Sequence, residues 1–512
     1  MKRVNTFLII FLSGINFTFC QQTNPIVQYT VSVPNPGLGM YQVELEIKGY
    51  HNDTLFFKMP RWMPGYYQIM DYASTLDNFG ASDPEGQMLY FNKTTQNTWM
   101  VINPAMTDVR IGYTIKTERQ FVANSFVDSQ HAYLVPANTF LYVSDLLNIP
   151  VRVKVKKPEN WNGITSGLEL VAGSQSDFTA PNFDILFDSP ILMGNLEELE
   201  PFYIQGIEHR FVGFNMGNFN KKLFIDDLKK VVEAGINIIG EIPYKQYTFI
   251  GIGPGLGGIE HLNNTIVCFD GNSLNTPEGR IRMLLFLGHE YFHNYNVKRI
   301  RPYELGPFDY ETENRTNLLW VSEGFTVYYE YLMLFRAGLI NENQLISKLE
   351  EDINALEQNP GRHYQSLIQA SYSTWEDGPF GKQGEAAKRS ISYYQKGPVM
   401  ALLLDFAIRK ASNNEKSLDH VMQFLYGEYY IKKNRGFTDA EFQMTCERIA
   451  GKFLSGVFEY TSTTKEIDYN AYLNFAGLTL DSLPDKTVKI SKVSHPTTDQ
   501  DETLKGWTQK KH

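Results

Sequence analysis

Hydrophobic and polar residues alternate along the first part of the chain and recur at helical spacing along the second. Runs such as VQYTVSV, YQVELEIKGY and VRVKVKK lie before about residue 200, and turn-forming sequences such as PNPG, NPAM and PEN separate them. Alternation with a period of two predicts half-buried β-strands, and no long helical pattern interrupts it. We therefore expect a β-sandwich-like or saddle-shaped N-terminal domain.

The pattern changes near residue 220. KKLFIDDLKKVVEAGINIIGEIP has apolar residues at helical spacing and predicts a helix that ends before Pro243. Two predicted strands, YTFIGIG and TIVCFD, flank a glycine-rich turn, and a second helix begins near Pro277 and Glu278. From about residue 320 to 480 the pattern is mostly helical, as in NENQLISKLEEDINALEQ and KGPVMALLLDFAIRKAS. The last thirty residues are polar, and we expect them to form a loosely ordered tail.

The first twenty residues, MKRVNTFLIIFLSGINFTFC, have the pattern of a secretory signal peptide, with two basic residues before an apolar stretch. Cleavage after Cys20 leaves Gln21 first, and the apolar stretch is short for a retained membrane anchor. A lipoprotein would keep Cys20, but Phe19 before it is not small. We expect export to the periplasm or the extracellular space.

The composition indicates a globular protein of several domains. The chain has 512 residues, of which 43% are hydrophobic, and its formal net charge is −10. That charge argues against a nucleic-acid partner. Beyond the signal segment only Cys268 and Cys446 remain, which permits one disulfide bond but does not require it.

The stretch LFLGHEYFHNYN places two histidines four residues apart within an apolar helix. Positions i and i+4 share one helix face, so His289 and His293 point to a common place, where they can bind zinc. Glu290 follows the first histidine, as in the HExxH pattern of zinc peptidases, where it serves as general base. Two ordinary half-buried histidines are the alternative interpretation.

A catalytic zinc needs a third protein ligand, and LLWVSEGFTVYYE offers Glu323. A carboxylate among apolar and aromatic residues is costly to bury without a positive partner, which a metal supplies. A glutamate on the solvated face of a helix is the alternative. Glu330, seven residues later, is positioned either to accept a hydrogen bond from a ligand histidine or to be exposed.

The chemistry of such a site follows from charge. Zinc lowers the pKa of a bound water and polarises the carbonyl to be cleaved, and Glu290 takes the proton and passes it to the leaving amine. A tyrosine hydroxyl is a suitable donor for the oxyanion. ISYYQKGPVM offers Tyr393 and Tyr394, and spacing alone does not choose between them.

At this point several motifs match a known family. HEYFHNYNVKRIRP and LGPFDYETENRTNLLWVSEGFTVYYE, with RWMPGYYQIMDYASTLDNFGA and VDSQHAYLVPANTFLYV before them, resemble the glycyl aminopeptidase family of gluzincin metallopeptidases over residues 25 to 480. The resemblance implies one zinc ion per chain, held by His289, His293 and Glu323, with Glu290 as base. Tyr394 rather than Tyr393 precedes x-Lys-Gly, which marks it as the residue that stabilises the oxyanion.

The GGIEH sequence at 257–261 resembles the exopeptidase motif of the same family. Glu260 would then hold the free α-ammonium of a peptide, while Gly257 and Gly258 would let the backbone approach it closely. An ordinary glycine turn with Glu260 exposed is the alternative.

The residue pattern and the resemblance together predict a domain plan: signal peptide (1–20), N-terminal β-rich domain (21–205), thermolysin-like catalytic domain (206–335), α-helical domain (336–482) and polar tail (483–512). Members of the family often carry a PDZ domain after the catalytic part, but too few residues follow Gly477 to form one.

Three functions remain open at this stage. The first is an exported zinc aminopeptidase that acts on peptides with a free N-terminus and prefers glycine or alanine, a preference implied by the family alone. The second is a zinc endopeptidase with the same metal site. The third is a non-catalytic peptide-binding protein, which would have no need of Glu290.

Overall fold

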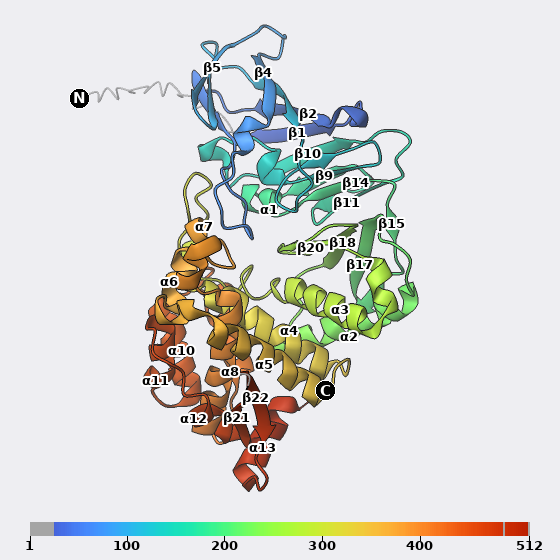
Figure 1. Ribbon diagram of the computed structural model, residues 1–512. Coiled ribbons are helices and arrows are strands. Elements are labelled where there is room, and N and C mark those ends of the chain that lie inside the picture. Colours follow the sequence, from blue (N-terminus) through green and yellow to red (C-terminus); the bar gives the residue numbers. More distant parts are fainter. Residues whose placement is uncertain (1–24, 485–486, 510–512) are drawn as a thin grey trace, which may run out of the picture.

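The structure, a computed structural model, describes residues 25–484 and 487–509. The predicted signal peptide, residues 1–20, lies outside these ranges. A β-rich part comes first, a mixed sheet with two helices follows, and a mostly helical part completes the chain (Figure 1). This order confirms the predicted multidomain α+β fold. Within the described ranges, no helix combines the length and the apolar character needed to cross a bilayer.

From residue 25 onward, the described N-terminal part contains three sheets. The seven-stranded sheet has the order β12-β13-β10-β1-β2-β7-β4. Its strands are β1 (Ile26–Ser32), β2 (Met40–Lys48), β4 (Leu76–Ser82), β7 (Val109–Lys116), β10 (Val151–Lys156), β12 (Glu169–Leu170) and β13 (Asp177–Ala180). A four-stranded sheet contains β8 (Phe126–Val127), β9 (His131–Leu134), β11 (Gly163–Ser166) and β14 (Ile191–Gly194), and a smaller sheet contains β3 (Thr54–Lys58), β5 (Tyr90–Thr95) and β6 (Thr98–Ile102).

The alternation in the sequence accounts for these strands. In β10 the three valines are buried, while the arginine and lysines between them are exposed. Successive side chains of a strand point to opposite faces, so one face joins the core and the other meets solvent. The short helix α1 (Phe183–Phe187) lies late in this part.

A second sheet connects the N-terminal part to the helices. Its path is β15-β17-β18-β20-β19, with β16 paired to β17. The strands are β15 (Glu197–Glu198), β16 (Phe202–Ile204), β17 (Ile207–Phe214), β18 (Gln246–Ile252), β19 (Gly258–Glu260) and β20 (Asn264–Cys268). The predicted helix between β17 and β18 is α2 (Lys221–Ile239), which begins after a capping Asn220 and ends at Gly240.

Each face of this sheet belongs to a different hydrophobic core. Ile250 and Ile266 pack into the core of the N-terminal part, whereas Phe249 and Val267 pack into the core formed with the helices. In Figure 1 the sheet lies between the β-rich part and helices α2 and α3 (Pro277–Phe292). Apolar residues on both faces of its strands therefore hold the two parts together.

The remaining helices share the second core. They are α4 (Phe325–Arg336), α5 (Glu342–Gln358), α6 (Leu367–Tyr372), α7 (Thr374–Asp377), α8 (Tyr393–Ala411), α9 (Leu418–Leu425), α10 (Asp439–Ala450), α11 (Ser455–Ser462) and α12 (Asn470–Leu473). Because the second core runs continuously from the mixed sheet into these helices, the domain boundary at residue 335 stays a prediction.

The expectation of a loosely ordered tail is wrong. After β21 (Leu478–Ser482), strand β22 (Val488–Lys492) pairs with it, and α13 (Thr498–Thr508) follows with a capping box at Thr497. Trp507 is fully buried, and its indole nitrogen donates to the hydroxyl of Tyr328 at 2.8 Å. Trp507 and the buried Ile490 thus anchor a segment that is otherwise mostly polar, because burial of a large aromatic ring is strongly favourable.

Candidate metal centre and active site

The histidine helix α3 begins as the sequence predicts. Thr276 caps it through Gly279, and Pro277 occupies the first helical position. His289 and Glu290 lie in its last turn, and His293 is the residue that ends it. All three are less than 9% exposed, so these polar groups are inside the protein and need partners.

Glu323 comes from a different element, which the sequence did not reveal in detail. Instead of one regular helix, residues Trp320–Gly324 form a π-helical turn that continues into α4. Such turns are rare and occur often at functional sites, because the extra residue redirects a side chain. Glu323 is 2% exposed, so the alternative of a solvated glutamate is excluded by its burial.

The structure brings the three candidate ligands together. Nε2 of His293 lies 3.0 Å from Nε2 of His289, and Oε2 of Glu323 lies 3.2 Å from the first and 3.6 Å from the second. Tetrahedral zinc with bonds of about 2.0–2.1 Å separates its ligand atoms by about 3.3 Å. Among the described residues these three are identified as a group of potential metal ligands.

The other ring nitrogens show that the Nε2 atoms are free to bind a cation. Nδ1 of His289 donates to the Glu330 carboxylate at 2.8 Å, and Nδ1 of His293 donates to the main-chain oxygen of Asn296 at 2.8 Å. A neutral imidazole that donates through Nδ1 presents a lone pair at Nε2. Two such lone pairs and a carboxylate facing one another repel unless a cation lies among them, so the donor set fits zinc.

The charges of the site perturb two carboxyl groups in opposite directions. Burial opposes the ionisation of Glu323, but without a metal ion the protonated forms of His293 and His289 attract the carboxylate and hold the pKa of Glu323 well below its usual range. Burial raises the pKa of Glu290 to about 7, against the opposing effect of both imidazoles. A carboxyl with a pKa near neutrality suits proton transfer at physiological pH.

Tyr394, and not Tyr393, contacts one of the candidate metal ligands. Its hydroxyl donates to Oε2 of Glu323 at 2.9 Å, whereas the Tyr393 hydroxyl bonds to Thr374 at 2.9 Å. The Tyr394 hydroxyl can reach Glu323 because α8 packs closely against the π turn. A Cβ atom at Gly397 would lie 2.6 Å from the Cα of Gly324, so only glycine lets α8 approach the π turn so closely.

The exopeptidase-like motif lies beside the same centre. Glu260 ends β19, an edge strand of the mixed sheet, and is 5% exposed, with no hydrogen bond to its Oε1 from the described residues. The alternative of an exposed Glu260 is therefore excluded. Gly257 has φ +98°, and a Cβ at Gly258 would lie 2.8 Å from Oε1 of Glu290, so both glycines are required by the local geometry.

Sequence reasoning missed two groups at the site. The side-chain amide of Asn296 lies within hydrogen-bond distance of the oxygens of Val321, Ser322 and Thr326, which ties the loop after α3 to the π turn. Lys298, 7% exposed at its side chain, binds Asp188 at 2.9 Å and approaches Oε1 of Glu260 at 3.7 Å. The sequence did contain a signal for both groups, because polar residues, Asn296 and Lys298 among them, closely follow the HExxH motif.

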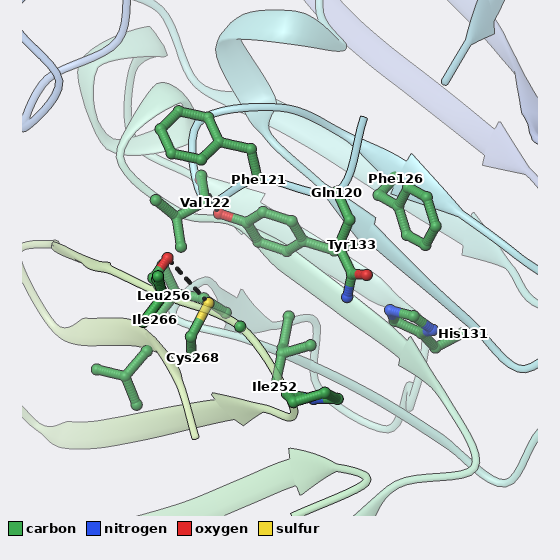
Figure 2. A pocket seen from close by; sticks show the side chains of 13 residues that line it. Gln120, Phe121, Val122, Phe126, His131, Tyr133, Ile252, Leu256, Ile266 and Cys268 are labelled. Carbon is green, nitrogen blue, oxygen red and sulfur yellow. Dashed lines mark hydrogen bonds between the residues drawn. The ribbon is translucent and has the colours of Figure 1, made fainter. Parts of the chain in front are cut away.

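A separate pocket of about 100 Å³ lies where β9 meets the ends of β18 and β20, and none of the metal-site residues lines it. Figure 2 shows the Cys268 thiol in this pocket, donating to the main-chain oxygen of Leu256. Burial raises the pKa of the thiol to about 11, so it stays protonated. Cys268 and Cys446 are both free thiols, which settles the question of a disulfide bond.

Comparison with known families agrees with this site. The model of the peptidase M61 N-terminal domain matches residues 28–195, and that of the M61 glycyl aminopeptidase matches residues 282–400. Together they span more than half of the chain. The chain belongs to the M61 glycyl aminopeptidase family. Its members are zinc metallopeptidases, and the second match includes all three candidate ligands, Glu290 and Tyr394.

Solved structures share the fold. The crystal structure of an aminopeptidase N family protein from Idiomarina loihiensis superimposes with a TM-score of 0.84 at 26% identity, covering 89% of this chain and 79% of that one. An M1 zinc metallopeptidase variant from Deinococcus radiodurans, bound to a Tyr-Ser-Ala substrate, gives 0.56 at 12% identity and covers 86% and 95%. Legionella pneumophila aminopeptidase A gives 0.54 at 14%, covering 92% and 52%. No curated protein matches the sequence.

Proposed function

We propose that this zinc metallopeptidase is an aminopeptidase that removes N-terminal residues, with glycine and alanine preferred, from peptides with a free α-amino group. The observation that carries the proposal is the convergence of His289, His293 and Glu323, whose ligand atoms all lie within 4.8 Å of one another. The small-residue preference derives from the family, and the peptide bound to the Deinococcus relative supports a peptide substrate.

His289, His293 and Glu323 would hold one zinc ion per chain. When bound, zinc supplies Lewis-acid chemistry, in that it acidifies a water molecule and polarises the carbonyl to be cleaved. Glu330 and the carbonyl of Asn296 orient the two imidazoles through their Nδ1 atoms.

Glu290 is the proposed general base. Its Oε2 has no hydrogen-bond partner among the described residues, and its pKa of about 7 lets it exchange a proton at neutral pH. It takes a proton from the attacking water and delivers that proton to the leaving amine. The helix that places His289 as a ligand also places this carboxylate beside the reacting groups.

Tyr394 is the proposed oxyanion donor. Burial and the charge of Glu323 raise the pKa of its hydroxyl well above the usual value, so it remains a protonated donor. A neutral donor positioned before the reaction stabilises the negative charge that develops on the carbonyl oxygen.

Glu260 is the proposed anchor of the substrate's α-ammonium. It is buried near Glu290, and its Oε1, which lies 3.7 Å from the Lys298 ammonium, accepts no hydrogen bond from the described residues and is free to accept one from an N–H donor. A fixed carboxylate at this position selects peptides with an unblocked N-terminus, since a blocked N-terminus carries no positive charge for the carboxylate to bind.

A hydrolysis panel tests the proposal. Glycine, alanine and leucine anilides are compared with an N-acetylated peptide, with and without a chelator. We expect cleavage of the free amines alone, and loss of it on chelation. Equal cleavage of the acetylated peptide would instead indicate an endopeptidase.

The Glu290→Gln variant tests the base. We expect kcat to fall by about 10²–10⁴-fold with zinc retained, because the ligands are unchanged. Glu278→Gln, an exposed position in the first turn of the same helix, is the control and should keep full activity. A Glu290→Gln enzyme as fast as wild type would refute the assigned base.

We also propose that the protein is exported, because residues 1–20 have the sequence pattern of a signal peptide. Fractionation of cells that express the full chain, with N-terminal sequencing of the mature protein, tests this. The presence of residue 1 in a cytoplasmic fraction would refute it.

A further inference from the structure

One motif of the N-terminal part reaches the active site and has no role in the chemistry described so far. It is the segment RWMPGYYQIMD, residues 61–71. A Cβ atom at Gly65 would lie 2.8 Å from Oε2 of Glu260 and 2.8 Å from a methyl carbon of Ile259. The main chain of this segment therefore packs directly against the proposed ammonium anchor.

Tyr67, two residues further on, connects this segment to the region before α8. Its ring is 8% exposed and packs edge-on against Trp375, with centroids 6.1 Å apart. Trp375 follows Thr374, whose hydroxyl bonds to Tyr393, the neighbour of Tyr394. The segment thus touches both the strand that carries Glu260 and the structure that supports the start of α8.

The hydroxyl of Tyr67 has no hydrogen-bond partner among the residues that the structure describes. Burial raises its pKa well above the usual value, and the charges of Glu260 and Glu323 add to that effect. It is therefore a neutral phenol, able both to donate and to accept. A hydroxyl that has no partner within the described residues and lies beside two carboxylates is available to a ligand.

We propose that Tyr67 is a substrate-binding residue whose hydroxyl oxygen accepts a hydrogen bond from the substrate's α-ammonium beside Glu260. An ammonium carries three N–H donors, and the two carboxylate oxygens of Glu260 accept at most two of them, so a further acceptor is needed to satisfy it. This inference rests on the proposed aminopeptidase function and makes the N-terminal domain part of the substrate site.

The Tyr67→Phe variant tests it, because it removes the hydroxyl and keeps the ring. For an alanine anilide we expect KM to rise about tenfold, the effect of losing one hydrogen bond to a charged group, with kcat within about threefold. The inhibition constant of alaninamide should rise in parallel, while N-acetylalaninamide stays a poor inhibitor of both enzymes. The melting temperature should not fall, since the hydroxyl has no partner within the protein.

Tyr66→Phe is the matched control. Tyr66 is the adjacent residue, but its hydroxyl donates to Gln68 at 3.0 Å and its ring packs on Phe121. This variant should leave KM and the alaninamide inhibition constant unchanged. Both variants remove one phenolic oxygen from the same segment, so only the position of that oxygen differs.

Three outcomes would overturn the proposal: unchanged KM and inhibition constant in Tyr67→Phe, a loss of kcat at constant KM, or a melting temperature lower by several degrees. The last would mean that the hydroxyl has a partner within the fold. Glu260→Gln separates this proposal from the proposed function. If Glu260→Gln raises KM and Tyr67→Phe does not, the proposed role of Tyr67 is refuted and the aminopeptidase function stands. If the wild-type enzyme cleaves acetylated peptides as well as free ones, the aminopeptidase function itself is refuted.

Discussion

Nδ1 of His293 donates to the main-chain oxygen of Asn296 across 2.8 Å, and the side-chain amide of the same asparagine holds the turn that carries Glu323. One residue therefore sets the orientation of one proposed ligand and the position of another. Because the first contact uses the main chain and the second the side chain, a substitution separates them.

Asn296→Ala should weaken zinc binding by about tenfold or more, the usual effect of losing a group that orients metal ligands. The metal-free protein should also lose about 1–3 kcal/mol of stability, since the carbonyls of Val321 and Ser322 lose their donor. Competition with a chromophoric chelator measures the affinity. Asn354→Ala, which removes a comparable amide from Val488 far from the site, should lower stability without changing zinc affinity. Equal zinc affinity in wild type and Asn296→Ala would contradict the prediction.

Tyr394→Phe should lower kcat by about 10²–10³-fold, as expected for the loss of one oxyanion donor, and should change KM little. Tyr393→Phe is the comparison, because the Tyr393 hydroxyl bonds to Thr374 and not to Glu323. Steady-state measurement of kcat and KM for both variants on an alanine anilide shows which tyrosine is the oxyanion donor. A larger loss of kcat in Tyr393→Phe than in Tyr394→Phe would reverse the assignment.

Gly397→Ala should lower both stability and kcat. The new methyl would lie 2.6 Å from the Cα of Gly324, so α8 must move outward and take the Tyr394 hydroxyl with it. Overpacking of this kind costs about 1–3 kcal/mol. Gly427→Ala is the control, since a Cβ there meets no atom within 4 Å, and it should be neutral. Thermal unfolding and kcat of both variants are the measurements, and a fully active Gly397→Ala enzyme would show that the close contact is not needed.

Asp188→Asn should destabilise the protein at neutral pH by about 3–5 kcal/mol, the cost of breaking a buried ion pair. Burial opposes the ionisation of Asp188, but Lys298 and His261 outweigh it and hold its pKa below the usual range, while Lys298 also faces Glu260. A lowered folded pKa gives stability that is fully present above the unfolded value of about 3.9 and is lost as the pH falls through the folded value.

The difference in melting temperature between wild type and Asp188→Asn should therefore be constant above about pH 5 and shrink below about pH 4. Melting curves from pH 7 to pH 2.5 measure it. A difference that persists unchanged at the lowest pH, or that grows on acidification, would contradict the prediction.

Local patterns were sufficient for most of the secondary structure. The alternation of VRVKVK became β10, and the apolar spacing of ENQLISKLEEDINALEQ became α5. The tail was misjudged because an average over thirty polar residues hides one tryptophan, and the π turn was missed because its sequence has ordinary helical spacing. Both depend on contacts with residues far away in the chain, Tyr328 for Trp507 and Asn296 for the turn.

The sequence by itself determined the ligand chemistry. The i, i+4 spacing puts two imidazoles on one helix face whatever surrounds them, and a carboxylate in an apolar stretch must find a positive partner. Only the tertiary structure decided which tyrosine faces Glu323, how Glu260 is buried, and that the N-terminal segment around Gly65 packs against it. Tyr394 and Glu323 are 71 positions apart and Gly65 and Glu260 nearly 200, and their geometry is set by the packing of whole elements, which no local pattern records.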